Sequence, residues 1–341
     1  MDTLTHALSG ALLARATAPR RPGPGSLPLA TRTWVGFLAA AFPDIDFALS
    51  WVDSLLYLNW HRGHTHSVVL LPLWTLLLAF VSHRLLRGRY PLRAFYGVCA
   101  LGVAIHIAGD VITTYGTRIF VPLSDVRVSL PTTFIIDPWF TGILAAGLLA
   151  SMLWPPRRAA AAGLLVLAAY VGLQGLWYRE ALELARDFAA ERGLSPGAAH
   201  AMPQPFSPVN WKLVVTDGDI YHQAYVRLHG RPVTARPDDP WWRRVAAAYR
   251  QPDEVHWNIV EHFGDERRNL AREAWKHPGF SGFRQFAVLP FLYGIDEDAD
   301  RTCVWFTDLR FVLESLTPPF RYGMCREGED GEWRLERLGR W

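Results

Sequence analysis

Long apolar stretches separated by short polar segments dominate the first half of the chain. Residues 67–83, 138–154 and 159–178 contain no Asp, Glu, Lys or Arg and approach the roughly 20 residues that a bilayer-spanning helix needs. Residues 33–51 and 94–113 are of similar length but carry aspartates, and the latter also carries a histidine. This pattern predicts about five transmembrane helices.

The N-terminal residues 2–14 have helical spacing but are too short to cross a bilayer. They lack the basic start of a secretory signal peptide, so we expect a short amphipathic or re-entrant helix that carries His6 into the bundle. The predicted fold is therefore mainly α, with a polytopic transmembrane bundle of about five spans and a short N-terminal helix. A soluble α+β domain is expected to follow.

Charge divides the chain near residue 180. Residues 1–178 hold 20 charged side chains, all Arg or Asp, whereas residues 179–341 hold 47, of which 22 are basic and 25 acidic. We therefore expect a membrane-embedded domain at 1–180, a linker or helix at 181–209 and a soluble domain at 210–341. The overall formal charge of +3 gives no reason to expect a nucleic-acid partner.

The second half mixes strand-like and helix-like runs. The runs typical of strands are 211–215, 220–228, 286–292 and 303–309, and the helix-like segments are 177–192 and 255–276. This mixture favours an α+β domain with an antiparallel sheet.

Arginine placement predicts the orientation in the membrane. The loops before the second, fourth and sixth helical segments are rich in Arg, and the positive-inside rule places such loops in the cytoplasm. Continuing the alternation puts the C-terminal domain outside the cytoplasm of a multi-pass membrane protein. Cys303 and Cys325 both lie in that domain, and two cysteines alone leave their pairing open.

Histidine and aspartate gather inside or beside the predicted spans. An ionisable group at membrane depth costs about 2.5–3.5 kcal/mol even on lenient scales, so such groups usually face the bundle interior and mark function. The residues concerned are His6, Asp44, Asp46, His61, His64, His66, His106 and Asp110. Taken together they favour a metal centre over a set of unrelated packing and capping residues.

Spacing suggests how these residues bind. His106 and Asp110 are four apart, hence on one helix face, where both can hold one ion. Asp44 and Asp46 follow Pro43 and converge only if the backbone leaves regular helix there. Imidazole and carboxylate together suit zinc, with manganese or iron as alternatives when more oxygens join.

The histidine-rich loop 61–67 adds further candidates. We expect His61 and His66 to be ligands, Arg62 to contact an anionic group, and His64 to act as a catalytic acid or base. Structural alternatives exist for several of the candidates. His6 could have a hydrogen-bonded packing role, and Arg62 could face lipid headgroups. His106 and Asp110 could be a buried pair, and Asp44 a helix cap.

Four motifs, taken together, resemble the YdjM-like group of membrane-bound metal-dependent hydrolases of bacterial inner membranes. The motifs are Met1-Asp2-Thr3-Leu4-Thr5-His6, Phe42-Pro43-Asp44-Ile45-Asp46, His61-Arg62-Gly63-His64-Thr65-His66-Ser67, and His106-x-x-x-Asp110 running into Thr113-Thr114-Tyr115-Gly116-Thr117. The resemblance covers roughly residues 1–180 and implies a metal-dependent hydrolase.

The order of ligands is also similar to that of the zinc-dependent phospholipases C. That resemblance implies one metal on Asp44 or Asp46, His61 or His66, His106 and Asp110, with His6 near a second metal. This chain departs from the phospholipases because it lacks the N-terminal tryptophan whose amine binds metal in them.

The sequence thus predicts a membrane-bound enzyme that hydrolyses a phosphoester or phosphodiester of a membrane lipid or lipid-linked substrate. A metal-activated water would attack, and Arg62 would steady the phosphate. One alternative is a metal or ion transporter, which would need polar residues continuing to the cytoplasmic ends of the helices. The other is a non-catalytic scaffold with a structural metal, whose C-terminal domain recruits a protein partner.

Overall fold

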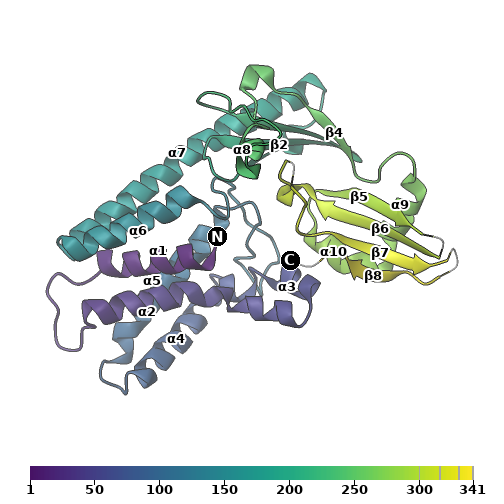
Figure 1. The fold of residues 1–341 in the computed structure, drawn as a ribbon. Coiled ribbons are helices and arrows are strands. Elements are labelled where there is room, and N and C mark those ends of the chain that lie inside the picture. Colours follow the sequence, from purple (N-terminus) through teal and green to yellow (C-terminus); the bar gives the residue numbers. More distant parts are fainter. Residues whose placement is uncertain (299, 315, 329–330, 340–341) are drawn as a thin grey trace. The chain divides into compact units, whose positions relative to one another are not determined.

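The computed structural model describes residues 1–298, 300–314, 316–328 and 331–339 and divides into two compact units (Figure 1). Unit 1 comprises Met1–Leu176 with Pro205–Pro208, and unit 2 comprises Trp177–Gln204 and the chain from Val209 onward. The first part of the expected linker 181–209 belongs to unit 2, because it is helical to residue 191 and then forms a strand.

Unit 1 is built from helices. Its α-helices are α1 (Thr3–Ala16), α2 (Leu29–Ala41), α3 (Ser54–Trp60), α4 (Leu71–Leu85), α5 (Leu92–Val111), α6 (Pro138–Leu153) and the first part of α7 (Pro156–Glu191), and its 3₁₀ helices are η1 (Phe42–Trp51) and η2 (His64–His66). α1, α2 and α5 pack against one another. Val35 and Ala39 of α2 contribute to a buried cluster with Phe95 and Val98 of α5.

The prediction of about five spans is wrong. Within the described residues, two helices are long and apolar enough to cross a membrane, α5 and α7, and a third span results only if α3–η2 and α4, bent by 80°, form one broken span. α2, α4 and α6 have 13, 15 and 16 residues, fewer than the roughly 20 that a bilayer requires. The apolar run 33–51 is divided because α2 ends before Pro43 and a 3₁₀ helix follows.

The predicted architecture of the C-terminal half also needs correction. It is a β region of two antiparallel four-stranded sheets, and the chain is 50% helical overall rather than mainly α. The first sheet holds β1 (Ala199–Pro203), β2 (Asn210–Asp217), β3 (Ile220–Arg227) and β4 (Asn258–Glu261), and the second β5 (Pro290–Glu297), β6 (Arg301–Asp308), β7 (Tyr322–Glu327) and β8 (Arg334–Arg337).

Short helices accompany these sheets. They are α8 (Trp241–Ala246), α9 (Arg268–Lys276), α10 (Ser281–Phe286) and the 3₁₀ turns η3 (Pro196–Ala198), η4 (Pro252–Glu254), η5 (Pro278–Phe280) and η6 (Leu309–Phe311). The strand expected at 286–292 begins only at Pro290, and the helix expected at 255–276 contains β4 before α9. Short apolar runs do not separate strand from helix by periodicity alone, which explains the first difference.

A buried lysine joins the two sheets of unit 2. The Nζ atom of Lys212, on β2, donates to the carbonyls of Leu309 at 2.8 Å and Val312 at 3.3 Å, in the segment after β6. Burial lowers the pKa of Lys212 to about 7. A backbone hydrogen bond of 2.9 Å from Leu292 to the carbonyl of His262 also links β5 to the residue after β4. The sheets are therefore tied at two places.

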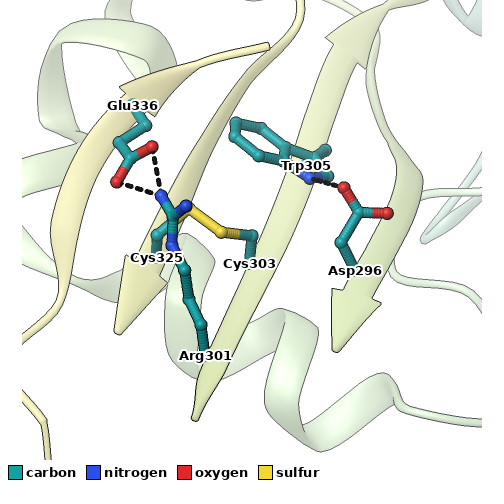
Figure 2. The surroundings of a disulfide bond; sticks show 6 residues. All are labelled: Asp296, Arg301, Cys303, Trp305, Cys325 and Glu336. Atoms are coloured by element: carbon teal, nitrogen blue, oxygen red, sulfur yellow. Dashed lines mark hydrogen bonds and ion pairs between the residues drawn. A yellow bond between two sulfur atoms is a disulfide. The ribbon is translucent and has the colours of Figure 1, made fainter. Parts of the chain in front are cut away.

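A disulfide joins the central strands of the second sheet (Figure 2). Cys303 on β6 lies directly opposite Cys325 on β7, so the pairing that the sequence left open is formed. Beside it, Trp305 donates from Nε1 to Asp296 at 2.8 Å. A Cβ atom on Gly323, the residue opposite Trp305, would lie 2.4 Å from the indole. Glycine is therefore required under this ring.

Small residues set the close approach of α1, α2 and α5. A Cβ atom on Gly10 would lie 2.3 Å from the carbonyl oxygen of Gly36, and one on Gly36 would lie 2.6 Å from Cβ of Ala14. On α5, a Cβ atom on Gly102 would lie 2.8 Å from Cβ of Ala39. Helices in membranes pack closely through such residues. The three helix backbones are thereby held near one another.

Replacing Gly36 with alanine tests this packing. The added methyl group has no room between α1 and α2, so we expect a loss of about 1–3 kcal/mol and a lower Tm for the detergent-purified protein. Gly172→Ala in α7 is the matched control, because a Cβ there meets no described atom within 4 Å. Equal Tm values for the two variants, measured by differential scanning fluorimetry, would contradict the close packing.

Candidate metal centre

Four of the predicted ligands converge in unit 1. Asp44, His66, His106 and Asp110 each place one ligand atom within 4.8 Å of the others. Asp44 lies on η1, directly after α2, and His66 lies on η2. His106 and Asp110 are on one face of α5, as their spacing predicted. Three segments distant in sequence therefore supply one donor set.

The separations between these atoms fit a small cation. Tetrahedral zinc with bonds of about 2.0–2.1 Å requires ligand atoms about 3.3–3.4 Å apart. Nε2 of His66 lies 2.9 Å from Nε2 of His106 and 3.2 Å from Oδ2 of Asp110, and His106 Nε2 lies 3.4 Å from the same oxygen. Oδ1 of Asp44 is 3.6 Å from His106 Nε2 and 3.7 Å from His66 Nε2. These five separations between ligand atoms lie on both sides of the value that tetrahedral zinc requires.

Asp110 divides its two oxygens between different tasks. Its Oδ1 atom is 2.5 Å from the amino group of Met1, 3.0 Å from Nη2 of Arg62 and 3.1 Å from Nε2 of His6. Its Oδ2 atom is buried and accepts no hydrogen bond from any residue that the structure describes. An unsatisfied buried carboxylate oxygen is costly. A cation between Oδ2 and the histidine nitrogens would satisfy it.

The tautomer of His106 points to the same conclusion. Its Nδ1 lies 2.6 Å from the carbonyl oxygen of Ala40, which only accepts, so Nδ1 carries the hydrogen and a neutral ring has a lone pair on Nε2. Metal-binding histidines are commonly oriented in this way through the second ring nitrogen. The residues present thus fit a metal ion such as zinc.

Burial favours the neutral form of two nitrogen groups beside this set, the His6 ring and the Met1 amino group. Burial is the main reason that the pKa of His6 is lowered to about 3, and the neighbouring His106 adds to the lowering. Burial and the neighbouring Arg62 lower the pKa of the Met1 amino group to about 6. Burial alone would raise the pKa of Asp44, but its contact with His66 and the nearby His106 lower it overall. Asp44 is therefore an ionised oxygen donor at neutral pH.

A second donor group shares His66 with the first. Asp46, His61 and His66 place ligand atoms within 4.8 Å of one another. Oδ1 of Asp46 is 2.9 Å from Nδ1 of His61, and its Oδ2 is 3.6 Å from Nδ1 of His66. The backbone N–H of Arg62 donates to the same Oδ2 at 3.2 Å. The predicted ligands thus fall into two adjoining groups.

Arg62 is turned into the protein. The residue is 1% exposed and has a positive φ of 59°, which is uncommon for a non-glycine residue. Its guanidinium contacts Asp110, donates to Thr113 Oγ1 at 2.5 Å and lies 5.0 Å from the ring centre of Tyr115. It therefore serves the buried carboxylate and does not face lipid headgroups.

Besides Arg62, two predicted residues lie outside both donor groups. His6 stacks on His106 with ring centres 3.7 Å apart and contacts Asp110 through Nε2. His64 stacks on Trp60 at 5.1 Å. No described contact joins His64 to either donor group, and its role as an acid or base stays a prediction.

Sequence reasoning missed several supporting residues. Thr3 donates to Asp44 Oδ2 at 2.6 Å, and Tyr115 donates to the carbonyl of Leu58 at 2.6 Å. The amino group of Met1 contacts Asp110, and the hydroxyl of Thr113 accepts a hydrogen bond from Arg62. Thr3, Thr113 and Tyr115 belong to motifs that were recognised, so their place in those motifs was the available signal.

The helical unit with its buried His and Asp donors defines a class of membrane protein with a candidate metal site. The chain belongs to the YdjM inner membrane protein family, which matches residues 1–181. This confirms the family that the motifs predicted. The hydrolase activity and the likeness to phospholipases C stay predictions.

One curated relative is the "Uncharacterized protein YfhP" of Bacillus subtilis (strain 168). It is 29% identical over 182 residues, which are 52% of this chain and 53% of that protein. The match thus spans about half the length of the relative. No solved structure matches this chain.

Removing first-group donors tests the centre. We expect Asp110→Asn and His106→Gln to lose the metal that copurifies with the wild type, because each removes an atom facing the other donors. The measurement is metal content by elemental mass spectrometry on detergent-purified protein. His83→Gln is the control, since His83 contacts the carbonyl of Tyr90 at the end of α4. Wild-type metal content in both donor variants would contradict the assignment.

Proposed function

We propose that the protein is a membrane-bound metal-dependent hydrolase that cleaves a phosphoester or phosphodiester of a lipid or lipid-linked substrate. The observation that carries the proposal is the unsatisfied Asp110 Oδ2 facing the Nε2 atoms of His66 and His106. These three atoms and Asp44 would hold a divalent cation, most simply zinc, with manganese or iron as alternatives. The cation would act as a Lewis acid on the phosphoryl oxygen and would lower the pKa of a bound water.

The donor set opens on the side of Asp44. The Asp44 side chain is 12% exposed, whereas those of His66, His106 and Asp110 are at most 1% exposed. Asp44 also forms the longest separations in the set. Four protein ligands would fill a tetrahedral zinc, so water or substrate would bind beside Asp44 by expanding the coordination to five. Substrate access beside Asp44 favours hydrolysis over a scaffold with a structural metal.

Exposed apolar side chains lie along and just after the η1 segment that carries Asp44. Ile45 and Phe47 flank Asp46 and are 60% and 54% exposed, and Trp51 and Val52 at the end of η1 are 81% and 77% exposed. Exposed apolar groups of this size mark contact with lipid or an apolar ligand. Their position on the segment that carries Asp44 supports a lipid substrate.

The core beside the site favours hydrolysis over transport. An ion path would need polar side chains continuing along α5 away from His106. The buried positions of α5 in that direction include Val103, Cys99, Val98 and Phe95, and the last three cluster with Val35 and Ala39 of α2. The described interior between these helices is therefore apolar on the side where a path would continue.

We also propose that the C-terminal domain lies outside the cytoplasm of an inner-membrane protein. The support is the Cys303–Cys325 disulfide, because disulfides persist in oxidising compartments. The alternation of five spans no longer supports this orientation, since two candidate spans are found.

Thiol accessibility tests the orientation. In spheroplasts of a bacterial host, we expect an impermeant reductant followed by a maleimide-polyethylene glycol to label Cys303 and Cys325 without lysis. Cys99 is the internal control, because it is buried within α5, and a Cys303→Ser/Cys325→Ser variant shows the background. Labelling that requires lysis would place the domain in the cytoplasm.

Chelation tests the reaction. The full-length protein in lipid–detergent micelles should hydrolyse bis(p-nitrophenyl) phosphate or a short-chain phospholipid, lose turnover with 1,10-phenanthroline and regain it with zinc or manganese. Asp110→Asn should lose more than the roughly 10–100-fold expected for a residue that only orients a ligand. Turnover that resists complete metal removal, verified by elemental analysis, would exclude the mechanism.

A further inference from the structure

We propose that the centre holds two metal ions, the second bound by Asp46, His61 and the Nδ1 atom of His66. The inference rests on the proposed function only in that the first donor group must bind a metal. The second ion is inferred mainly from the position of the His66 ring, which lies between two separate carboxylate groups.

His66 presents one nitrogen to each group. The residue is fully buried, with Nε2 facing Asp110 Oδ2 at 3.2 Å and Asp44 Oδ1 at 3.7 Å, and with Nδ1 facing Asp46 Oδ2 at 3.6 Å. The two nitrogens lie on different edges of the ring, and each can hold a different ion when the ring is an imidazolate, its remaining proton being released to solvent as the second ion binds. A separation of 3.6 Å is too long for a hydrogen bond but is compatible with two ligands of one cation.

The second group has further donors at suitable distances. Nδ1 of His61 lies 2.9 Å from Asp46 Oδ1. Thr65 adds a hydroxyl oxygen, 2.9 Å from His66 Nδ1 and 3.4 Å from Asp46 Oδ2. Nitrogen and oxygen donors of this kind suit zinc or manganese. The group therefore offers a complete set of ligand types without borrowing Asp44 or Asp110.

Asp46 has no cationic partner other than imidazole within the described part of the chain. Its side chain is 7% exposed, and its ion-pair contacts are with His61 and His66. Asp110, in contrast, contacts Arg62 and the Met1 amino group. A carboxylate this buried is stabilised by a compensating charge. Two divalent ions would also leave the centre attractive for an anionic phosphoester.

The competing explanation is that Asp46 only orients histidines. A carboxylate that accepts from the far nitrogen of a metal-bound histidine is common, and the 2.9 Å contact with His61 fits an ordinary hydrogen bond. In that case one ion binds and His61 is not a ligand. Metal stoichiometry separates these explanations without any measurement of activity.

The experiment measures bound metal on the full-length protein. Detergent-purified protein is stripped with a chelator, titrated with Zn²⁺ and desalted, and its zinc is counted by elemental mass spectrometry. We expect two equivalents for the wild type and one for His61→Gln. His64→Gln should keep two equivalents and is the matched control, because His64 lies in the same loop and belongs to neither donor group.

A spectroscopic readout tests the second site in the wild type itself. Loading the wild type with Mn²⁺ should give the electron paramagnetic resonance signal of a magnetically coupled pair, and His61→Gln should give that of an isolated ion. One zinc equivalent and an uncoupled signal in the wild type would overturn the second site. Two zinc equivalents retained in His61→Gln would overturn the assignment of His61 as a ligand of the second ion.

The outcomes for this site and for hydrolysis are distinguishable. One bound ion together with metal-dependent phosphoester turnover would overturn the second site and leave the proposed function standing. Two bound ions without turnover of any phosphoester would support the second site and remove the proposed function. No bound ion under metal-supplemented conditions would overturn both.

Discussion

Unit 1 depends on the contacts of one buried group, the carboxylate of Asp110. Its Oδ1 atom contacts the Met1 amino group, the His6 ring and the Arg62 guanidinium. Met1 and His6 belong to the N-terminal segment, and Arg62 belongs to the histidine-rich loop. The helix of Asp110, α5, is one of the two candidate spans. A single carboxylate thus ties together three parts of the chain. A charge so deeply buried is tolerated only with such partners.

Close helix packing makes that convergence geometrically attainable. In a membrane, apolar side chains gain nothing by leaving lipid, so contact between helices relies on small residues and polar interactions. Gly10 and Gly36 let α1 and α2 approach until a Cβ would clash, and Gly102 does the same for α5. His6 and Asp44 are brought to α5 by this approach. The glycines and the donor set are therefore two aspects of one constraint.

The sequence predicted those features that depend on local spacing. His106 and Asp110 share a helix face because they are four residues apart. The arrangement of the loop was beyond prediction, because it depends on the positive φ of Arg62 and on contacts with residues from α5 onward. The motifs therefore identified the residues of the site but not its division into two groups around His66.

The errors in the fold have a related cause. Hydropathy counts apolar residues, and in 33–51 it does not register that α2 ends before Pro43 and that a 3₁₀ helix carries Asp44 and Asp46. The break that removed a predicted span also positions the donors, since regular helix would send residues two apart toward different faces. The failed span and the candidate site therefore have the same origin.

The anchoring of three of the four first-group donors gives the strongest reason to regard the arrangement as a built site. Asp44 accepts from Thr3 on one oxygen, His106 donates from Nδ1 to Ala40, and Asp110 is held through Oδ1. In each case the second polar atom is directed toward the common centre. A packing network would be expected to satisfy its inward atoms too. Here the outward atoms are satisfied and Asp110 Oδ2 is not, which is the arrangement that preorganised metal ligands require.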